Sequence, residues 1–281
     1  MKAWLERVWY RPEPPPALLR PLSRAYGAVA THLAESRKQQ AQRLPVPVIV
    51  VGNVAVGGTG KTPSVLWLVQ ALKRLGHRPG ILSRGYGGRG PFPFMVAPGA
   101  DPALCGDEPA LMAERGGVPL AVAPDRLAAG RLREPPERAR QAGLILVNGG
   151  AAPAFGDTAV GFRLVTASAV NLRSGERRAH QDFQGAAVHA VAGIGNPARY
   201  FESLRGQGLQ LREHAFADHH AYTAADLDFG DDAPLLMTEK DAVKCRAFAR
   251  PQWWAVPAEL AFEGDGEARL QGLLGQGPAS R

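Results

Sequence analysis

The stretch "VIVVGNVAVGGTGKTP", residues 48–63, constrains the fold of this chain more than any other part of the sequence. The apolar run Val46–Gly52 predicts a buried parallel strand, and a glycine-rich turn follows it. The segment Thr62–His77 has the pattern of a helix, with Gly76 just past its end. A strand, a glycine-rich turn and a helix in this order are typical of phosphate-binding loops in α/β proteins.

The turn itself fits the P-loop pattern, with alanine in place of the first glycine. Its residues are Ala55, Val56, Gly57, Gly58, Thr59, Gly60, Lys61 and Thr62. In such a loop the backbone N–H groups and the helix N-terminus bind phosphate oxygens. Lys61 is placed to reach the β- and γ-phosphates, and the Thr62 hydroxyl to ligate Mg²⁺. We therefore predict a nucleoside triphosphate site for ATP with Mg²⁺; the alternative is a glycine-rich turn without a ligand.

Apolar runs and helical patterns alternate along the rest of the chain. This alternation predicts an α/β fold: a P-loop NTPase-like, doubly wound, mostly parallel sheet in two lobes, with an N-terminal amphipathic helical arm. Further strands are expected within 79–90, 118–124, 143–150, 187–195 and 234–245, and a helix at 197–208. The predicted parts are a membrane-interface helical arm (1–44), a P-loop kinase lobe (45–160), an antiparallel connector (161–186) and a C-terminal α/β lobe (187–281).

The arm is basic as well as amphipathic. Residues 17–43 place leucine, tyrosine and valine at helical spacing and carry five positive charges: Arg20, Arg24, Arg37, Lys38 and Arg43. Such a helix suits an anionic membrane interface, and the net charge of +7 favours anionic partners. The alternative is a helix that packs on its own domain.

No nucleic-acid-binding module is recognisable, so we expect no nucleic acid partner. The two cysteines, far apart, fit a reducing compartment.

Five motifs occur together in a fixed order. They are "VGNVAVGGTGKTP" (51–63), "ILSRGYGG" (81–88), "CGDEP" (105–109), "ADHHAYT" (217–223) and "MTEKDAVKCRAFA" (237–249). In these motifs the chain resembles the tetraacyldisaccharide 4′-kinase family of lipid A biosynthesis. The resemblance implies transfer of the γ-phosphate of ATP to the 4′-hydroxyl of tetraacyldisaccharide 1-phosphate, which forms lipid IVA. It also implies a peripheral enzyme, held by its N-terminal helix at the cytoplasmic face of the bacterial inner membrane.

The resemblance assigns roles to single residues as well. It makes Asp107 the group that takes the proton from the sugar hydroxyl, with His219 as its partner rather than the adjacent His220. It places Arg84 and Tyr86 on a loop near the active site. It also places a charged pair, Arg133 and Glu134, near the substrate.

One part of the family pattern is missing. The family carries an Asp-Asp-Gly-Leu-Gln-His segment for metal binding between the counterparts of Arg126 and Arg133, and here only "LAAGRL" separates them. We therefore predict a shortened first lobe that lacks strands of its sheet, and impaired phosphoryl transfer. Two rival functions follow: a membrane-associated protein that binds nucleotide without catalysis, and a soluble ATPase or kinase with another acceptor.

Overall fold

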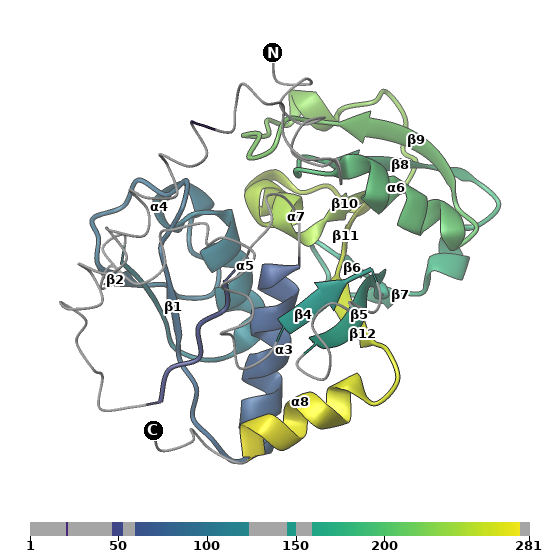
Figure 1. Cartoon of the computed structure of the whole chain (residues 1–281). Coiled ribbons are helices and arrows are strands. Elements are labelled where there is room, and N and C mark those ends of the chain that lie inside the picture. Colours follow the sequence, from purple (N-terminus) through teal and green to yellow (C-terminus); the bar gives the residue numbers. More distant parts are fainter. Residues whose placement is uncertain (1–20, 22–46, 53–59, 124–144, 150–158, 276–281) are drawn as a thin grey trace.

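A computed structural model describes residue 21 and the ranges 47–52, 60–123, 145–149 and 159–275 (Figure 1). Except for residue 21, the N-terminal arm lies outside the described residues, as do the first part of the phosphate loop and the site of the predicted shortening. No helix in the described ranges is long and apolar enough to cross a membrane.

The larger sheet has six strands in the order β7-β6-β11-β10-β8-β9. They are β6 (Ala169–Asn171), β7 (Arg177–Arg178), β8 (Ala187–Ala192), β9 (Gln210–Ala215), β10 (Leu235–Thr238) and β11 (Trp253–Val256). The neighbours β11, β10, β8 and β9 pair in parallel, whereas β6 and β7 add an antiparallel edge. Parallel neighbours need crossover connections. The helices α6 (Pro197–Gly206) and α7 (Glu239–Cys245) lie on these connections.

Both faces of this sheet are covered, as a doubly wound fold requires. On one face Leu236 packs with α6 residues such as Phe201 and Leu204. On the other face Leu235 and Met237 pack with α7 residues such as Ala242. Successive residues of a strand point to opposite faces, so the apolar Leu235, Leu236 and Met237 of β10 supply both faces, and all four residues of the strand are buried.

The first lobe is built around a smaller sheet, β1-β3-β2. Its elements are α3 (Lys61–Arg74), β1 (Ile81–Ser83), β2 (Phe94–Met95), α4 (Pro102–Cys105), α5 (Asp107–Gly116) and β3 (Leu120–Val122). The predicted helix is confirmed as α3, and Gly76, at φ 83°, donates its N–H to the Lys73 carbonyl after the last turn. Leu66 of α3 and Met112 of α5 join Leu120 in one buried cluster.

A third sheet, β12-β5-β4, brings the end of the chain back to the first lobe. It consists of β4 (Ile145–Asn148), β5 (Ala159–Thr166) and β12 (Ala258–Phe262), and α8 (Gly266–Gly275) follows it. Phe262 of β12 meets Trp67 of α3 with ring centroids 5.0 Å apart. The connector segment is divided between sheets, because β5 lies here while β6 and β7 extend the larger sheet. Short 3-10 turns complete the described elements: η4 (His180–Phe183), η5 (Ala225–Leu227) and η6 (Arg246–Phe248).

The strand predicted before the phosphate loop is absent from the described residues 47–52. This prediction is wrong there: Val48, Ile49 and Val50 are 60%, 51% and 72% exposed. A strand is held by ladder bonds to its neighbours. The sequence predicts that the missing residues between Arg126 and Arg133 include strands of this lobe, and an apolar run without such neighbours stays unpaired.

Candidate active site

The described end of the phosphate loop forms the start of α3. Gly60 caps the helix with φ 92° and ψ 18°, and a Cβ atom there would lie 3.3 Å from the Phe162 ring. Lys61 and Thr62 are the first two helical residues, and Lys61 is exposed. The first N–H groups of a helix have no partners within it and carry its positive dipole end, so this terminus favours phosphate. Ala55, Val56, Gly57, Gly58 and Thr59 lie outside the described residues.

Asp107 begins α5, and the loop after β1 packs against the chain just before it. The carbonyls of Ala103 and Leu104 accept backbone hydrogen bonds of 2.9 Å from Arg89 and Gly90. This packing brings Tyr86 close to Asp107's histidine partner, since the ring centroids of Tyr86 and His219 lie 5.4 Å apart. Tyr86 itself is 74% exposed. The first lobe thus presents a carboxylate and an aromatic ring on one surface.

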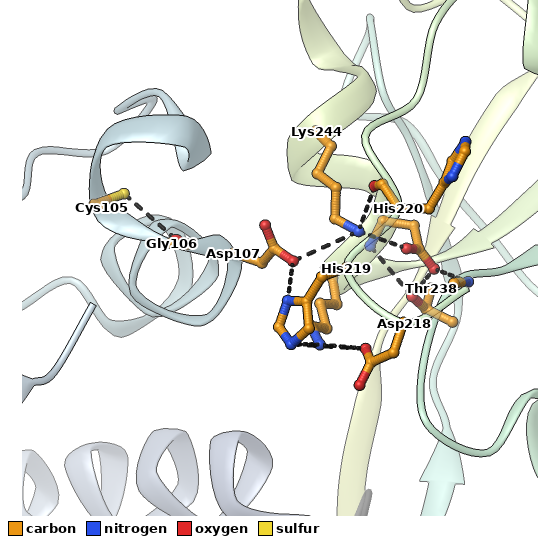
Figure 2. Close-up of polar contacts among 11 residues, drawn as sticks. Cys105, Gly106, Asp107, Asp218, His219, His220, Thr238 and Lys244 are labelled. Atoms are coloured by element: carbon orange, nitrogen blue, oxygen red, sulfur yellow. Dashed lines mark hydrogen bonds and ion pairs between the residues drawn. The ribbon is translucent and has the colours of Figure 1, made fainter. Parts of the chain in front are cut away.

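His219 reaches Asp107 from the other lobe. Its Nδ1 lies 3.0 Å from Asp107 Oδ2, and Figure 2 shows the ring pointing at the carboxylate. His219 follows β9 and has φ 63°, which makes it the one residue other than glycine with positive φ in the described ranges. Strained backbone of this kind persists where the surrounding structure enforces it, and it concentrates at functional sites. The structure therefore brings together the two residues that the resemblance pairs.

The opposite nitrogen of the same ring faces a lysine. Lys240 Nζ lies 3.4 Å from His219 Nε2 and donates to Asp218 Oδ1 at 2.9 Å. Burial acts to raise the pKa of Asp218, but the Lys240 hydrogen bond and charge outweigh it, so this pKa is lowered. With its proton on Nδ1, His219 donates to Asp107 while Nε2 accepts from Lys240. Nε2 also lies 3.8 Å from Asp218 Oδ1, so charged groups hold the ring at both of its nitrogens.

His220 does not take part in this arrangement. Its ring lies 4.8 Å from those of Phe216 and Tyr222, and its Nε2 lies 3.5 Å from Asp226 Oδ2. Only the backbone carbonyl of His220 faces the site, where it accepts from Lys244 Nζ at 3.2 Å. Of the two adjacent histidines, His219 is therefore the one with its side chain on Asp107.

Lys244 is a member of the site that our sequence reasoning missed. Its Nζ lies 3.5 Å from Asp107 Oδ2 and 3.0 Å from Oδ1 of the fully buried Asp241. The signal was present in the sequence, because both residues lie in the "MTEKDAVKCRAFA" motif. The motif indicated the family resemblance, but no local sequence pattern indicates which of its charged side chains contacts Asp107.

The remaining predicted residues are placed only in part. Arg84 follows β1 at the start of the docked loop and is half-buried. Arg133 and Glu134 lie outside the described residues. In the described ranges no group of three or more histidine, cysteine or acidic side chains could hold a metal. Mg²⁺ that arrives with a triphosphate is bound by the phosphates and by one or two protein carboxylates. The assignment of the Thr62 hydroxyl, at the start of α3, as a metal ligand stays a prediction.

Comparison with known proteins agrees with this architecture. A model of the family described as LpxK, tetraacyldisaccharide-1-P 4′-kinase, matches residues 16–129 and 127–275. The chain belongs to this family. A tetraacyldisaccharide 4′-kinase from Pseudomonas paraeruginosa is 43% identical, over 95% of this chain and 97% of the relative. One from Pseudomonas entomophila is 42% identical, over 95% of this chain and 96% of the relative.

A solved structure has the same fold as this chain. It is the "apo" form of LpxK from Aquifex aeolicus in complex with ATP, with a TM-score of 0.75 and 24% sequence identity. The match covers 92% of this chain and 98% of that one. The fold is therefore that of the family over nearly the whole length.

The same comparisons bear on the predicted shortening. The alignment with the Pseudomonas paraeruginosa relative runs over 324 residues, which exceeds the 281 residues of this chain. The two segments that match the family model meet at residues 127–129, within the predicted interval 126–133. Both observations indicate that the relatives carry internal residues that this chain lacks.

Proposed function

We propose that this chain transfers the γ-phosphate of ATP to the 4′-hydroxyl of tetraacyldisaccharide 1-phosphate in lipid A biosynthesis. The observation that carries the proposal is the contact of 3.0 Å between Asp107 and His219, made across the two lobes in a chain of the LpxK family. A carboxylate held by a histidine is suited to take the proton of an attacking hydroxyl.

The residues have distinct tasks in this reaction. Lys61 and the N–H groups at the start of α3 bind the phosphates and stabilise the charge that develops on them. Asp107 accepts the hydroxyl proton, and His219 holds the carboxylate through its Nδ1–H. Arg84 and Tyr86, with Arg133 and Glu134, are proposed to contact the acceptor. Mg²⁺, held by Thr62 when bound, would neutralise charge on the transferred phosphate.

Phosphate transfer to the lipid tests the proposal directly. We expect γ-labelled ATP and Mg²⁺ to give labelled lipid from tetraacyldisaccharide 1-phosphate in detergent micelles. Lys61→Ala should lower the rate by about 100-fold, since it removes a phosphate-binding cation. Lys73→Ala, a change in the last turn of the same helix, is the matched control and should leave the rate near that of the parent.

The rival functions predict other results in the same assay. The shortened first lobe favours a protein that binds nucleotide without transfer. Such a protein would bind ATP, as measured by calorimetry, in a manner that depends on Lys61, and would give no labelled lipid. A kinase with another acceptor would label a water-soluble sugar instead. Either result would overturn the proposal.

We also propose peripheral binding to the cytoplasmic face of the inner membrane through residues 17–43. The support is their basic, amphipathic sequence and the lipid substrate of the family. The chain should co-sediment with vesicles that contain phosphatidylglycerol and bind weakly to phosphatidylcholine alone. Replacing Arg20, Arg24, Arg37 and Lys38 with glutamine should abolish this difference. Equal binding of parent and variant to both vesicles would contradict the proposed arm.

A further inference from the structure

The Lys244 ammonium is enclosed by oxygen acceptors at the junction of the two lobes. Its side chain is 8% exposed, and Nζ lies 3.0 Å from Asp241 Oδ1, 3.2 Å from the His220 carbonyl and 3.5 Å from Asp107 Oδ2. The first two acceptors belong to the second lobe, as Lys244 itself does, and only Asp107 belongs to the first. A cation of the second lobe is therefore fixed against the carboxylate of the first.

Asp241 fixes the position of this cation. It is fully buried, and its Oδ2 accepts from the Gly193 N–H at 2.9 Å and from the Thr238 hydroxyl at 2.6 Å. A buried carboxylate needs an ion partner, because an uncompensated charge in the interior is costly. Lys244 supplies that partner through the oxygen that the other two groups leave open. Its ammonium is thus held in place independently of Asp107.

Both groups that reach Asp107 from the second lobe use the same oxygen. His219 Nδ1 lies 3.0 Å and Lys244 Nζ 3.5 Å from Oδ2, and Figure 2 shows both side chains pointing toward the carboxylate. Neither contact involves Oδ1. Because both contacts fall on one oxygen, the carboxylate is held with Oδ2 toward the second lobe, and Oδ1 is left free of these two contacts.

We propose that Lys244 is a positioning residue that, together with His219, holds Asp107 so that Oδ1 faces the acceptor hydroxyl. This inference rests on the proposed function. In the reaction the hydroxyl O–H bond breaks and its proton passes to Oδ1. The sugar oxygen bonds to the γ-phosphorus, whose bond to the leaving ADP breaks. Lys244 keeps its protons throughout and acts through Asp107 alone.

The alternative is that Lys244 only neutralises Asp241 and has no effect on Asp107. The two roles differ in a double-mutant cycle. A positioning residue loses its effect on the rate once the residue that it positions is gone. A residue that only supports the fold lowers the rate by the same factor whether Asp107 is present or not.

The experiment compares Lys244→Met with Arg246→Met, each in the parent and in an Asp107→Asn background. Arg246 is the matched control, because it also joins the second lobe to α5, from η6 directly after α7, through Glu114 at 2.6 Å and without touching Asp107. We expect Lys244→Met to lower kcat for lipid phosphorylation by about 10- to 100-fold, with KM for ATP unchanged. In the Asp107→Asn background it should cause no further loss. Lys244→Arg should restore part of kcat, and Arg246→Met should stay near the parent.

Folding is controlled with a second pair of variants. If Lys244→Met unfolds, it is combined with Asp241→Asn, whose amide oxygen can still accept from Gly193 and Thr238 while the buried charge is removed. Asp241→Asn alone is then the reference. Equal losses with and without Asp107, or a Lys244 variant as active as Arg246→Met, would overturn the inference alone. A parent that labels no lipid would overturn the proposed function and this inference together.

Discussion

Gly106 precedes Asp107 with φ 94° and ψ 154°, a backbone conformation that is essentially restricted to glycine. A Cβ atom at this position would lie 2.5 Å from the Tyr86 carbonyl oxygen. The absence of a side chain therefore allows the loop after β1 to touch the chain immediately before Asp107. At the scale of single residues, the position of the Asp107 carboxylate depends on the glycine that precedes it.

Gly106→Ala should lower the free energy of unfolding by about 1–3 kcal/mol. The new Cβ atom strains the backbone and clashes with the Tyr86 carbonyl oxygen. The substitution should also lower kcat, since Asp107 must move with the chain. Gly87→Ala is the control: Gly87 has φ 84°, but a Cβ there would meet no atom within 4 Å. Chemical denaturation of both variants measures the difference. Equal destabilisation would mean that the contact with Tyr86 contributes nothing.

Asp107→Asn should keep the fold and remove the proton acceptor. We expect kcat to fall by about 100- to 10,000-fold, the range for a lost general base, while ATP binding is retained. Asp101→Asn makes the same chemical change at the N-cap of α4, where asparagine caps as well as aspartate. It should leave kcat near that of the parent. A fully active Asp107→Asn variant would rule out Asp107 as the base.

At the scale of elements, strands β8 and β9 and the loop before β10 carry a chain of titratable groups outside the active site. His189 Nδ1 lies 2.9 Å from His214 Nε2, and His189 Nε2 lies 3.0 Å from Asp231 Oδ1. Burial, and then the charges of His189 and Arg212, lower the pKa of His214. The backbone N–H of Ala233, and then the hydrogen bond from His189, lower the pKa of Asp231 to about 2.

This pair of strands should lose stability in mild acid. Because the folded-state pKa of His214 is below its unfolded value, the unfolded chain binds more protons as pH falls below about 6.5, and the free energy of unfolding decreases. Asp231 contributes only below about pH 4, by the same rule. We expect Tm to fall less between pH 7 and pH 5 in His214→Gln than in the parent. The exposed His77→Gln is the control and should follow the parent; a His214→Gln variant that did the same would contradict the assignment.

At the scale of the whole molecule, helices α5 and α7 join the two lobes. Arg115 Nη1 meets Glu239 Oε2 at 2.8 Å, and Lys244 meets Asp107. Asp107, at the start of α5, contacts Lys244 through the packing of these helices, and it contacts His219 of the loop after β9. In the described part of the first lobe, Val48–Val50 belongs to no strand.

Restoring the missing chain should repair the first lobe. We expect a chimera that carries the Pseudomonas paraeruginosa segment between Arg126 and Arg133 to slow amide hydrogen exchange at Val48–Val50. Its kcat should rise at least about tenfold, because the resemblance places acidic metal ligands in that segment. A glycine-serine insert of equal length is the control and should change neither quantity. A chimera indistinguishable from that control would show that the present chain is complete without the segment.

The sequence alone determined the helices α3 and α6, the strands β8 and β10 of the larger sheet and the family. These features depend on neighbouring residues, such as the apolar run of β10 or Pro197 at the start of α6, and so they can be predicted locally. The motif order also supplied Asp107 and His219 through the resemblance.

Only the tertiary structure decided how those motifs meet. Asp107 and His219 are separated by 112 positions, and the turn of His219 rather than His220 towards Asp107 depends on the packing of Phe216 and Tyr222. The same holds for Lys244 and for the return of β12 to the first lobe. Val48–Val50 shows the converse: its sequence predicts a strand, but a strand forms only where another strand lies beside it to complete the hydrogen bonds.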